Sequence, residues 1–379
     1  MTMLTEDQNL IFDTARRYAH EVLAPGAAER EKAQAIEPAV FRGLAEMGLL
    51  GMTVSPDYDG AGADYVSYAA ALMAVAEGDG AVSTVMSVHN APFCAIVERY
   101  GDAAQKETVL KPAARGEFIG GFALTESHAG SDASALRTRA VRHGDRYVLN
   151  GAKQFITSGK IGKYVIAFAV TDPANPKRGI SAFLVPTDTK GYTVSKIEHK
   201  LGQKASDTCS LNFDDMEVPV ENLIGTEGEG YRIALSSLET GRIGIAAQSI
   251  GMAQAALDAA VRYAAERKSF GKALLEHQAV SFRLVDAKTR LEAARQLVYS
   301  AARMKDAGLP CLDQACMAKL FASETAEAVC SAAIQTFGGY GYVEDFPVER
   351  IYRDVRVCQI YEGTSDIQKI IIGRSLAAA

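Results

Sequence analysis

The sequence predicts a mainly α protein with a central all-β domain. Apolar residues recur at helical spacing in the first 120 residues and again beyond residue 228. Between these regions the period changes to two, and β-branched and aromatic residues become frequent. We therefore expect three domains: an N-terminal helical domain over 1–120, a middle β-barrel-like domain over 121–227, and a C-terminal four-helix bundle over 228–379.

The N-terminal region reads as a series of helices. Thr5 and Gln8 fit a capping box that starts the first one. No charged leader followed by an apolar run precedes it, so we expect a cytoplasmic protein. No apolar stretch reaches the roughly 18 residues that a membrane span needs. Helical spacing or Ala-rich composition marks the stretches 6–23, 38–49, 66–77 and 91–114.

The middle region alternates in the manner of half-buried strands. Residues 147–149 and 155–157 flank an Asn-Gly pair at 150–151, which predicts a hairpin turn there. Similar strand patterns continue to residue 213.

A Gly-rich linker at 225–230 precedes the C-terminal helices. Alternating spacings of four and three predict the seam of a left-handed helix bundle, for which core packing is a sufficient explanation. The seam residues are Leu284, Ala287, Leu291, Ala294, Val298 and Ala301.

Composition narrows the class of partner. Acidic residues outnumber basic ones 46 to 40, for a net charge of -6, and no basic run occurs. This balance argues against nucleic acid or an anionic membrane surface as a partner and favours a small molecule. The six cysteines and six histidines lack paired or metal-ligand spacing, so we expect neither a disulfide framework nor a metal site.

The leading candidate for catalysis is Glu362. An apolar environment raises the pKa of a carboxyl group toward the range useful for proton abstraction. Gly363 leaves room beside it, and Ser365 with Gln368 fits a capping box for a last helix. The alternative is a salt-bridged surface glutamate at a helix entry. The expected apolar wall consists of the preceding residues Val355, Val357, Ile360 and Tyr361.

Four further segments could hold a ligand. Residues 122–132 place hydroxyls and free amides on one loop, which suits a flat polar ring or a diphosphate, or forms an ordinary connection. Residues 155–158 offer an aromatic face beside a hydroxyl. The basic residues at 267–271 could meet a diphosphate or complement a helix dipole. The glycines within 335–342 permit close backbone approach or end a helix. No Rossmann or P-loop motif is present.

In this order, the segments resemble the acyl-CoA dehydrogenase family over essentially the whole chain. The matching motifs are Thr-Glu-x-x-x-Gly-Ser-Asp at 125–132, Arg-Lys-x-Phe-Gly at 267–271 and Tyr-Glu-Gly-Thr-Ser at 361–365. The resemblance implies an FAD-dependent oxidoreductase that converts a short-chain or short branched-chain acyl-CoA to trans-2-enoyl-CoA. Glu362 would take the α-proton, flavin N5 the β-hydride, and an electron-transferring flavoprotein the electrons.

The resemblance also implies a place in fatty acid β-oxidation or branched-chain amino acid catabolism, and a homo-oligomer, usually a homotetramer. Substrate contacts would fall at Ser131, Arg242, Tyr361 and Gly363. Cofactor contacts, in part from a neighbouring subunit, would fall at Phe122, Leu124, Thr125, Gly130, Ser131, Phe155, Ile156, Thr157, Arg267, Phe270, Gln278, Gln335, Gly338, Gly339, Thr364 and Asp366.

Two positions refine this assignment. Phe155 stands where many relatives have Trp, and because the chain has no Trp, an aromatic face is kept with slightly less stacking area. Gly241 precedes Arg242, which matches members that use the C-terminal glutamate as the base instead of one on a bundle helix. Arg242 could instead form a structural salt bridge. The stretches 200–209 and 241–246 look most like the short-chain and short branched-chain subgroup.

Two rival functions stay open. One is an acyl-CoA oxidase on the same scaffold, which would pass electrons to oxygen. The other is a non-catalytic helical binding protein, which would take up no FAD.

Overall fold

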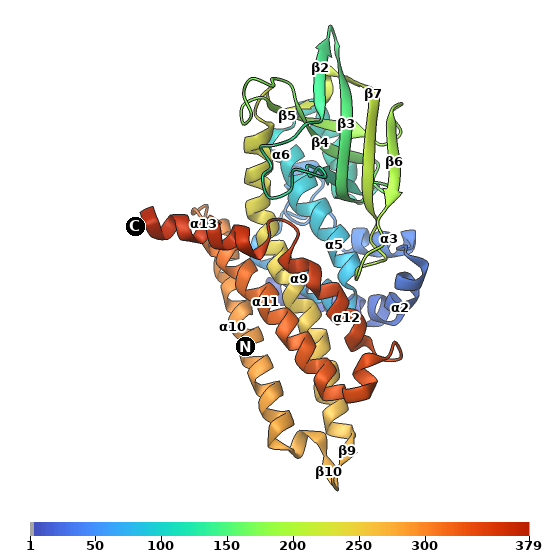
Figure 1. The fold of residues 1–379 in the computed structure, drawn as a ribbon, viewed down its shortest axis with the longest axis vertical. Coiled ribbons are helices and arrows are strands. Elements are labelled where there is room, and N and C mark those ends of the chain that lie inside the picture. Colours follow the sequence, from blue (N-terminus) through green and yellow to red (C-terminus); the bar gives the residue numbers. More distant parts are fainter. Residues whose placement is uncertain (1–3, 379) are drawn as a thin grey trace.

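The computed structural model describes residues 4–378, and Figure 1 shows the sheet at one end of the molecule and the C-terminal helices extending to the other. At the first helix, the predicted capping box is confirmed: the backbone N–H of Gln8 donates to Thr5 Oγ1, and that of Thr5 donates to Gln8 Oε1. The N-terminal helices are α1 (Glu6–Tyr18), α2 (Ala24–Ala33), α3 (Pro38–Glu46), α4 (Tyr65–Gly78), α5 (Gly80–Val88), α6 (Ala95–Tyr100), α7 (Ala103–Gln105) and α8 (Lys111–Ala114).

One helical stretch departs from the expectation about membrane spans. Gly80–Tyr100 is long and apolar enough to cross a membrane by length and composition. Of its most apolar window, however, 89% is buried inside the fold. A buried core helix of a soluble protein passes the same test, so this stretch is weak evidence for a span.

The middle part is an eight-stranded sheet. Its strands pair in the order β6-β7-β3-β2-β4-β5-β8, and β1 pairs with β4 in parallel. The pairing path is open, with β6 and β8 at its ends. The strands are β1 (Gly120–Ala123), β2 (Arg139–His143), β3 (Arg146–Thr157), β4 (Tyr164–Val170), β5 (Ile180–Pro186), β6 (Tyr192–Ile197), β7 (Thr208–Pro219) and β8 (Leu223–Ile224).

The predicted hairpin turn at Asn150 is wrong. Strand β3 runs straight through this position, and the turn lies earlier, at Gly144 with φ 63°. Asn150 instead bonds across to β7: its Nδ2 donates to Asp215 Oδ1 at 3.0 Å, and the Asp215 N–H donates to its Oδ1 at 2.8 Å. The Asn-Gly pair therefore lies at a register shift in the long β3–β7 strand pair. The polar side chain of Asn150 is satisfied there by hydrogen bonds to β7.

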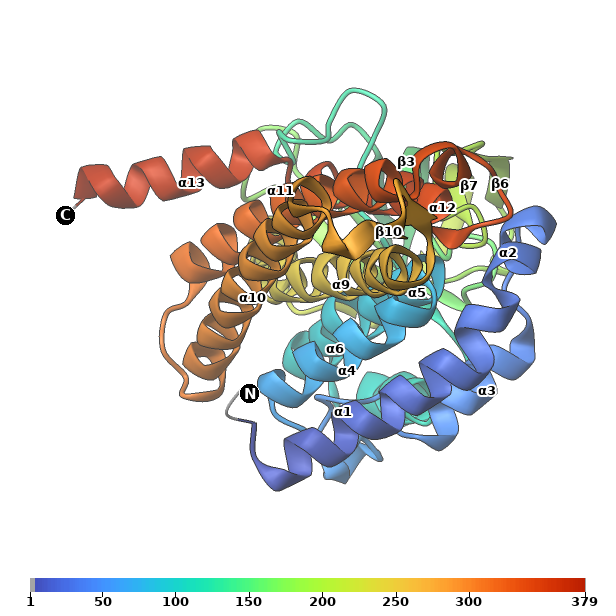
Figure 2. The same ribbon diagram turned by 90° about the horizontal axis from the view of Figure 1, so that it is seen from below.

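The C-terminal part is a helix bundle from which α13 projects (Figures 1 and 2). The predicted seam is confirmed, since all six seam residues of α10 are at most 5% exposed. Its elements are α9 (Gly230–Glu266), β9 (Lys268–Ser269), β10 (Lys272–Ala273), α10 (Gln278–Asp306), α11 (Leu312–Phe337), α12 (Pro347–Val355) and α13 (Ser365–Ala378).

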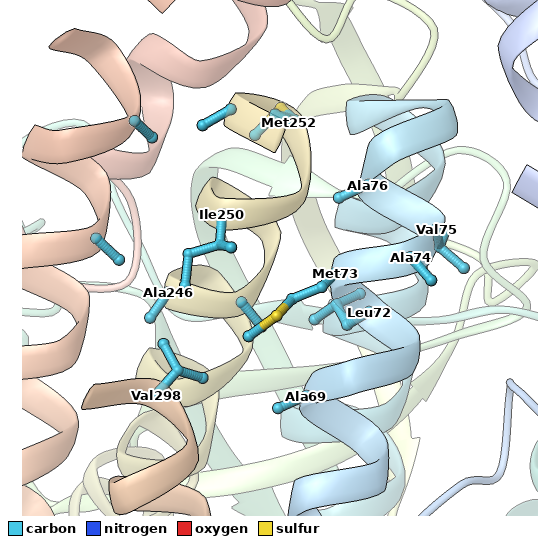
Figure 3. Close-up of a cluster of buried hydrophobic side chains, with 14 of the residues drawn as sticks. Ala69, Leu72, Met73, Ala74, Val75, Ala76, Ala246, Ile250, Met252 and Val298 are labelled. Atoms are coloured by element: carbon cyan, nitrogen blue, oxygen red, sulfur yellow. The ribbon is translucent and has the colours of Figure 1, made fainter. Parts of the chain in front are cut away.

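The N-terminal helices and the bundle share one hydrophobic core. Figure 3 shows side chains of α4, α9 and α10 meeting in it. Close approach of α4 and α9 depends on Gly251, where a Cβ atom would lie 2.1 Å from the carbonyl oxygen of Met73. The long helix α9 is therefore fixed along its length, which makes it a rigid support for the candidate site.

Candidate active site

Glu362 lies in a short loop between a 3-10 turn at Arg356–Gln359 and helix α13. It has φ 52°, and Gly363 has φ 90°. The left-handed conformation costs a non-glycine residue roughly 1–2 kcal/mol. Contacts from neighbouring elements must therefore hold the loop in this shape.

The carboxyl group of Glu362 lies against α9 at Gly241. A Cβ atom at Gly241 would come within 2.0 Å of Glu362 Oε2, so the glycine creates the space that the carboxyl group occupies. Oε2 is out of contact with solvent and has no hydrogen-bond partner among the described residues. This burial raises the pKa of Glu362, and the positive charges of Lys319 and Arg242 oppose the increase.

The predicted direction of this pKa shift is confirmed, but the predicted wall is only partly right. Val355 is fully buried, whereas Ile360 is 52% exposed. The carboxyl group also lies against Gly241 of α9 and near the charges of Arg242 of α9 and Lys319 of α11, which are distant from it in sequence. A glutamate in this position is also not the salt-bridged surface residue of the alternative interpretation.

Lys319 of α11 is hydrogen-bonded to the loop that carries Glu362. It is 1% exposed, and its Nζ donates to the carbonyl oxygen of Tyr361 at 2.7 Å and to that of Gly363. Gln368 Nε2 also donates to the Gly363 carbonyl, at 2.8 Å. The carbonyls of both residues that flank Glu362 in sequence are thus held.

The predicted cap of the last helix is wrong by one residue. Thr364 Oγ1 accepts from the N–H of Ile367 at 3.3 Å, while the hydroxyl of Ser365 is buried and without a partner among the described residues. Thr364 is therefore the N-cap, and Gln368 turns back to the loop carbonyls. Asp366, at the start of the helix, is exposed.

Three of the predicted substrate contacts adjoin the base: Gly363, which follows it in the loop, Arg242 and Tyr361. Arg242 is 5% exposed, its Nε has no hydrogen-bond partner, and it forms no salt bridge within the described residues, which leaves its charge available to the site. The hydroxyl of Tyr361 donates to Gln248 Oε1 at 2.5 Å, which anchors the loop to α9. Of the described residues, none accepts a hydrogen bond from the backbone N–H of Glu362.

A buried ion pair shapes the loop at 122–132. Lys153 Nζ lies 2.8 Å from Glu126 Oε1 and donates to the carbonyl of Leu124 at 3.1 Å. Glu126 also accepts from the backbone N–H groups of Arg137 at 2.7 Å and Thr138 at 3.0 Å. Burial acts to raise the pKa of Glu126, but the positive charge of Lys153, together with these hydrogen bonds, holds it below its ordinary value. Glu126 therefore organises the loop from inside.

Phe155 is placed on the surface by an irregularity in the sheet. It has φ 60°, at a register shift between β3 and β7, and its ring is 61% exposed. The N–H of the preceding Gln154 donates to the carbonyl of Thr125 at 2.8 Å, so the loop and the strand end form one unit. A large exposed ring on a strained residue indicates a surface that a ligand covers.

The remaining predicted cofactor contacts near this loop differ in how far their side chains are exposed. Gly130 and Ser131 are exposed, and Phe122, Thr125 and Thr157 are half-buried. The side chains of Leu124 and Ile156, however, pack inside the two sheet-side cores. Those two residues can offer a ligand only backbone atoms.

The other predicted contacts lie at the far end of the molecule, near β9 and β10 (Figure 1). Arg267, Gly338 and Gly339 line an open cleft of about 670 Å³ together with Tyr263 and Phe337, whose rings stack 4.2 Å apart. Phe270 is 94% exposed there, and Gln278 and Gln335 are exposed as well.

The two sets of predicted contacts are far apart within one chain. Roughly 25 residues of continuous helix α9 separate Gly241 from Arg267, which is about 40 Å at 1.5 Å per residue. A single molecule thus brings Glu362, Gly241 and Arg242 together but does not bring the Arg267 group to them.

Sequence reasoning missed Lys319, Lys153 and Gln248. A usable signal exists for Lys319, because it interrupts an otherwise buried helix face formed by Ala315 and Ala322. A charged residue on such a face indicates a specific buried partner. Among the described residues, no group of three or more His, Cys, Asp or Glu side chains is arranged to hold a metal ion.

Comparison with known proteins adds an independent line of evidence. Three family models match in chain order: the acyl-CoA dehydrogenase N-terminal domain at residues 5–117, the middle domain at 121–216 and the C-terminal domain at 228–377. The chain is 45% identical to an acyl-CoA dehydrogenase of Bacillus subtilis over 373 residues, with 98% of both proteins covered.

Solved structures agree with this match. Butyryl-CoA dehydrogenase from Megasphaera elsdenii superposes with a TM-score of 0.97 at 40% identity, and both chains are covered completely. A chain from a structure described as the electron transferring flavoprotein of Acidaminococcus fermentans superposes with a TM-score of 0.98 at 43% identity, again over both complete chains.

Proposed function

Because the chain belongs to the acyl-CoA dehydrogenase family, we propose that it oxidises a short-chain or short branched-chain acyl-CoA to the trans-2-enoyl-CoA, with Glu362 as the catalytic base. The family makes it an FAD-dependent oxidoreductase. The single observation that carries the assignment of the base is the buried, unpaired carboxyl oxygen of Glu362 facing Gly241.

The residues of the first contact set fit FAD. The exposed ring of Phe155 offers a stacking face, and the hydroxyls of Thr125, Ser131 and Thr157 lie on the adjoining loop and strand end. The buried pair Glu126–Lys153 keeps this platform in place. When bound, FAD supplies the redox chemistry by accepting the β-hydrogen as a hydride.

The chain's own residues handle the proton. Glu362 Oε2 has no competing hydrogen bond, so it is free to accept the α-hydrogen as a proton. The free backbone N–H of Glu362 is available to donate to the thioester carbonyl, where negative charge develops. Arg242 adds a buried positive charge that favours the ionised form of the base.

One variant tests the base. Glu362→Gln keeps the shape of the side chain, so the purified protein should stay yellow with bound FAD but lose turnover by several orders of magnitude. Glu324→Gln is the matched control, since Glu324 is exposed on α11 and pairs only at the surface with Lys369. Normal turnover by Glu362→Gln would place the base elsewhere.

The acyl group is proposed to be short. The match to a butyryl-CoA dehydrogenase supports this, and the stretches 200–209 and 241–246 agree with it. Anaerobic titration with straight and branched acyl-CoAs of increasing length, followed by bleaching of the flavin band, measures the preference. Efficient bleaching by long chains alone would contradict it.

We further propose that electrons pass to an electron-transferring flavoprotein in the cytoplasm. The likeness to a chain solved in a structure of such a flavoprotein supports the partner. Turnover that depends on added electron-transferring flavoprotein, with little peroxide formed in air, is the expected result. Rapid peroxide formation would favour the oxidase alternative, and a colourless protein that takes up no FAD would favour a binding protein.

A homo-oligomer, in family terms a tetramer, would complete the cofactor site. The cleft at Arg267 lies about 40 Å from Gly241 along α9, so we propose that it serves the FAD held by a second subunit. Mixing Arg267→Ala with Glu362→Gln tests this sharing. Subunit exchange should restore activity, because some mixed sites then carry neither substitution; a mixture no more active than its components would contradict sharing.

A further inference from the structure

We propose that Lys319 is a positioning residue for the base: by holding the peptide carbonyls on both sides of Glu362, it fixes the direction of that carboxyl group. The inference rests on the proposed role of Glu362. It assigns a function to a buried side chain that the mechanism above does not use.

The first argument is geometric. Lys319 Nζ donates to the carbonyls of Tyr361 and Gly363, which flank Glu362 directly. The Tyr361 carbonyl lies in the peptide plane that enters the Glu362 Cα atom, and the Gly363 carbonyl lies in the plane that leaves Gly363, so the two contacts fix the loop on both sides of Glu362. With φ at 52°, this residue would relax toward the right-handed region if the planes were free.

The second argument is the cost of placing a cation there. Lys319 is 1% exposed, and no carboxylate lies within salt-bridge distance of its Nζ among the described residues. Burial without a close ion pair is expensive, and it lowers the pKa of Lys319. An apolar residue could fill the same helix face between Ala315 and Ala322 without this desolvation cost. The hydrogen bonds to the Tyr361 and Gly363 carbonyls therefore explain why a lysine stands here.

The third argument concerns charge. Lys319 is the largest influence that lowers the pKa of Glu362 against desolvation, with Arg242 of α9 second. The other titratable groups facing this cluster are Tyr68 of α4, Cys316 of α11 and Cys358 before the loop. All three are neutral near pH 7, since burial raises the pKa of each. Removing Lys319 would therefore leave Arg242 as the nearby positive charge.

The test uses the FAD-loaded enzyme with three substitutions. Lys319→Met removes both the donors and the charge, Lys319→Gln keeps amide donors without the charge, and Lys319→Arg keeps charge and donors. Lys369→Met is the matched control, because Lys369 is exposed on α13. FAD content and thermal midpoint report whether each variant is folded.

Lys319→Met should lower kcat by about 100-fold, as expected for a displacement of the reacting group near 1 Å, with a smaller change in KM. The acid limb of its kcat/KM profile should move to higher pH by about one unit, because the base loses its main stabilising charge. Lys319→Gln should show the same shift with a smaller loss of kcat, and Lys319→Arg should restore most of both.

An unshifted acid limb and a kcat within twofold of the parent in FAD-loaded Lys319→Met would overturn the inference. If that variant fails to load FAD, an unshifted acid limb in Lys319→Gln would overturn it equally. A purely structural role moves the thermal midpoint and leaves the acid limb where it is. Failure of the proposed function itself is distinguishable, because then Glu362→Gln would retain turnover.

Discussion

Gly241→Ala should inactivate the enzyme without disturbing its fold or flavin. The new Cβ atom would lie 2.0 Å from Glu362 Oε2, whereas ordinary contacts begin near 3.4 Å. The carboxyl group must therefore move by at least about 1.4 Å or swing out of the site. A misplacement of 1 Å costs about 100-fold in rate, so kcat/KM should fall about 100-fold or more, equivalent to about 2.7 kcal/mol of transition-state stabilisation.

Anaerobic stopped-flow reduction of the flavin by butyryl-CoA isolates the step that should slow. Gly373→Ala in α13 is the matched control, because a Cβ atom there meets no heavy atom within 4 Å. It introduces the same increase in helix propensity without steric conflict. Flavin content and thermal midpoint of the two variants should be alike.

A compensating change sharpens the test. Glu362→Asp shortens the side chain by one methylene, so in the Gly241→Ala background it should relieve the conflict and recover part of the rate. Full activity in Gly241→Ala alone would refute the described position of the carboxyl group. An equal loss in the single and double variants would show that crowding is not the cause.

Three further outcomes are expected. Phe155→Ala should weaken FAD binding about 10-fold by loss of ring stacking, measured by fluorescence titration of the apoprotein. Lys153→Met should cost about 3–5 kcal/mol and most of the bound FAD, because Glu126 is left buried and unpaired; Glu126→Gln added to it should recover part of the loss in thermal midpoint. Burial raises the pKa of Asp354 to about 7, so its folded form holds a proton that the unfolded form releases near pH 4. The contribution of Asp354 to stability should therefore fall by about 4 kcal/mol as pH rises from 4 to 7, so the thermal midpoint of the parent should drop relative to that of Asp354→Asn over this range; parallel curves for both proteins would contradict this.

Local patterns in the sequence predicted the local features well. The α10 seam and the Thr5–Gln8 capping box depend on spacings of a few residues, and both are present. The same local reasoning fails where two neighbouring residues could cap the same helix with the same kind of side chain. Thr364 and Ser365 both precede a helical pattern, and only the observed bond from Ile367 selects Thr364 as the cap.

Features that depend on distant partners were not predictable in this way. Lys319 is 42 and 44 residues from the carbonyls that it holds, and Asn150 is 65 residues from Asp215. The raised pKa of Glu362 was predicted in direction, but the contact of its carboxyl group with Gly241 of α9 and the charges of Arg242 and Lys319 could not be predicted from the neighbouring sequence. The residues around Glu362 in the sequence were enough to select it as the candidate base, but its surroundings depend on tertiary packing.

The continuity of α9 constrains how a complete site can form. This helix carries Gly241 and Arg242 beside the base and ends at Glu266, next to Arg267 of the aromatic cleft. Its packing on α4 leaves no space even for a methyl group at Gly251, so bending it to bring both ends to one ligand would break the shared core. If one FAD contacts both groups, as we propose, it lies between two chains, and loss of assembly should then weaken cofactor binding before it unfolds the protein.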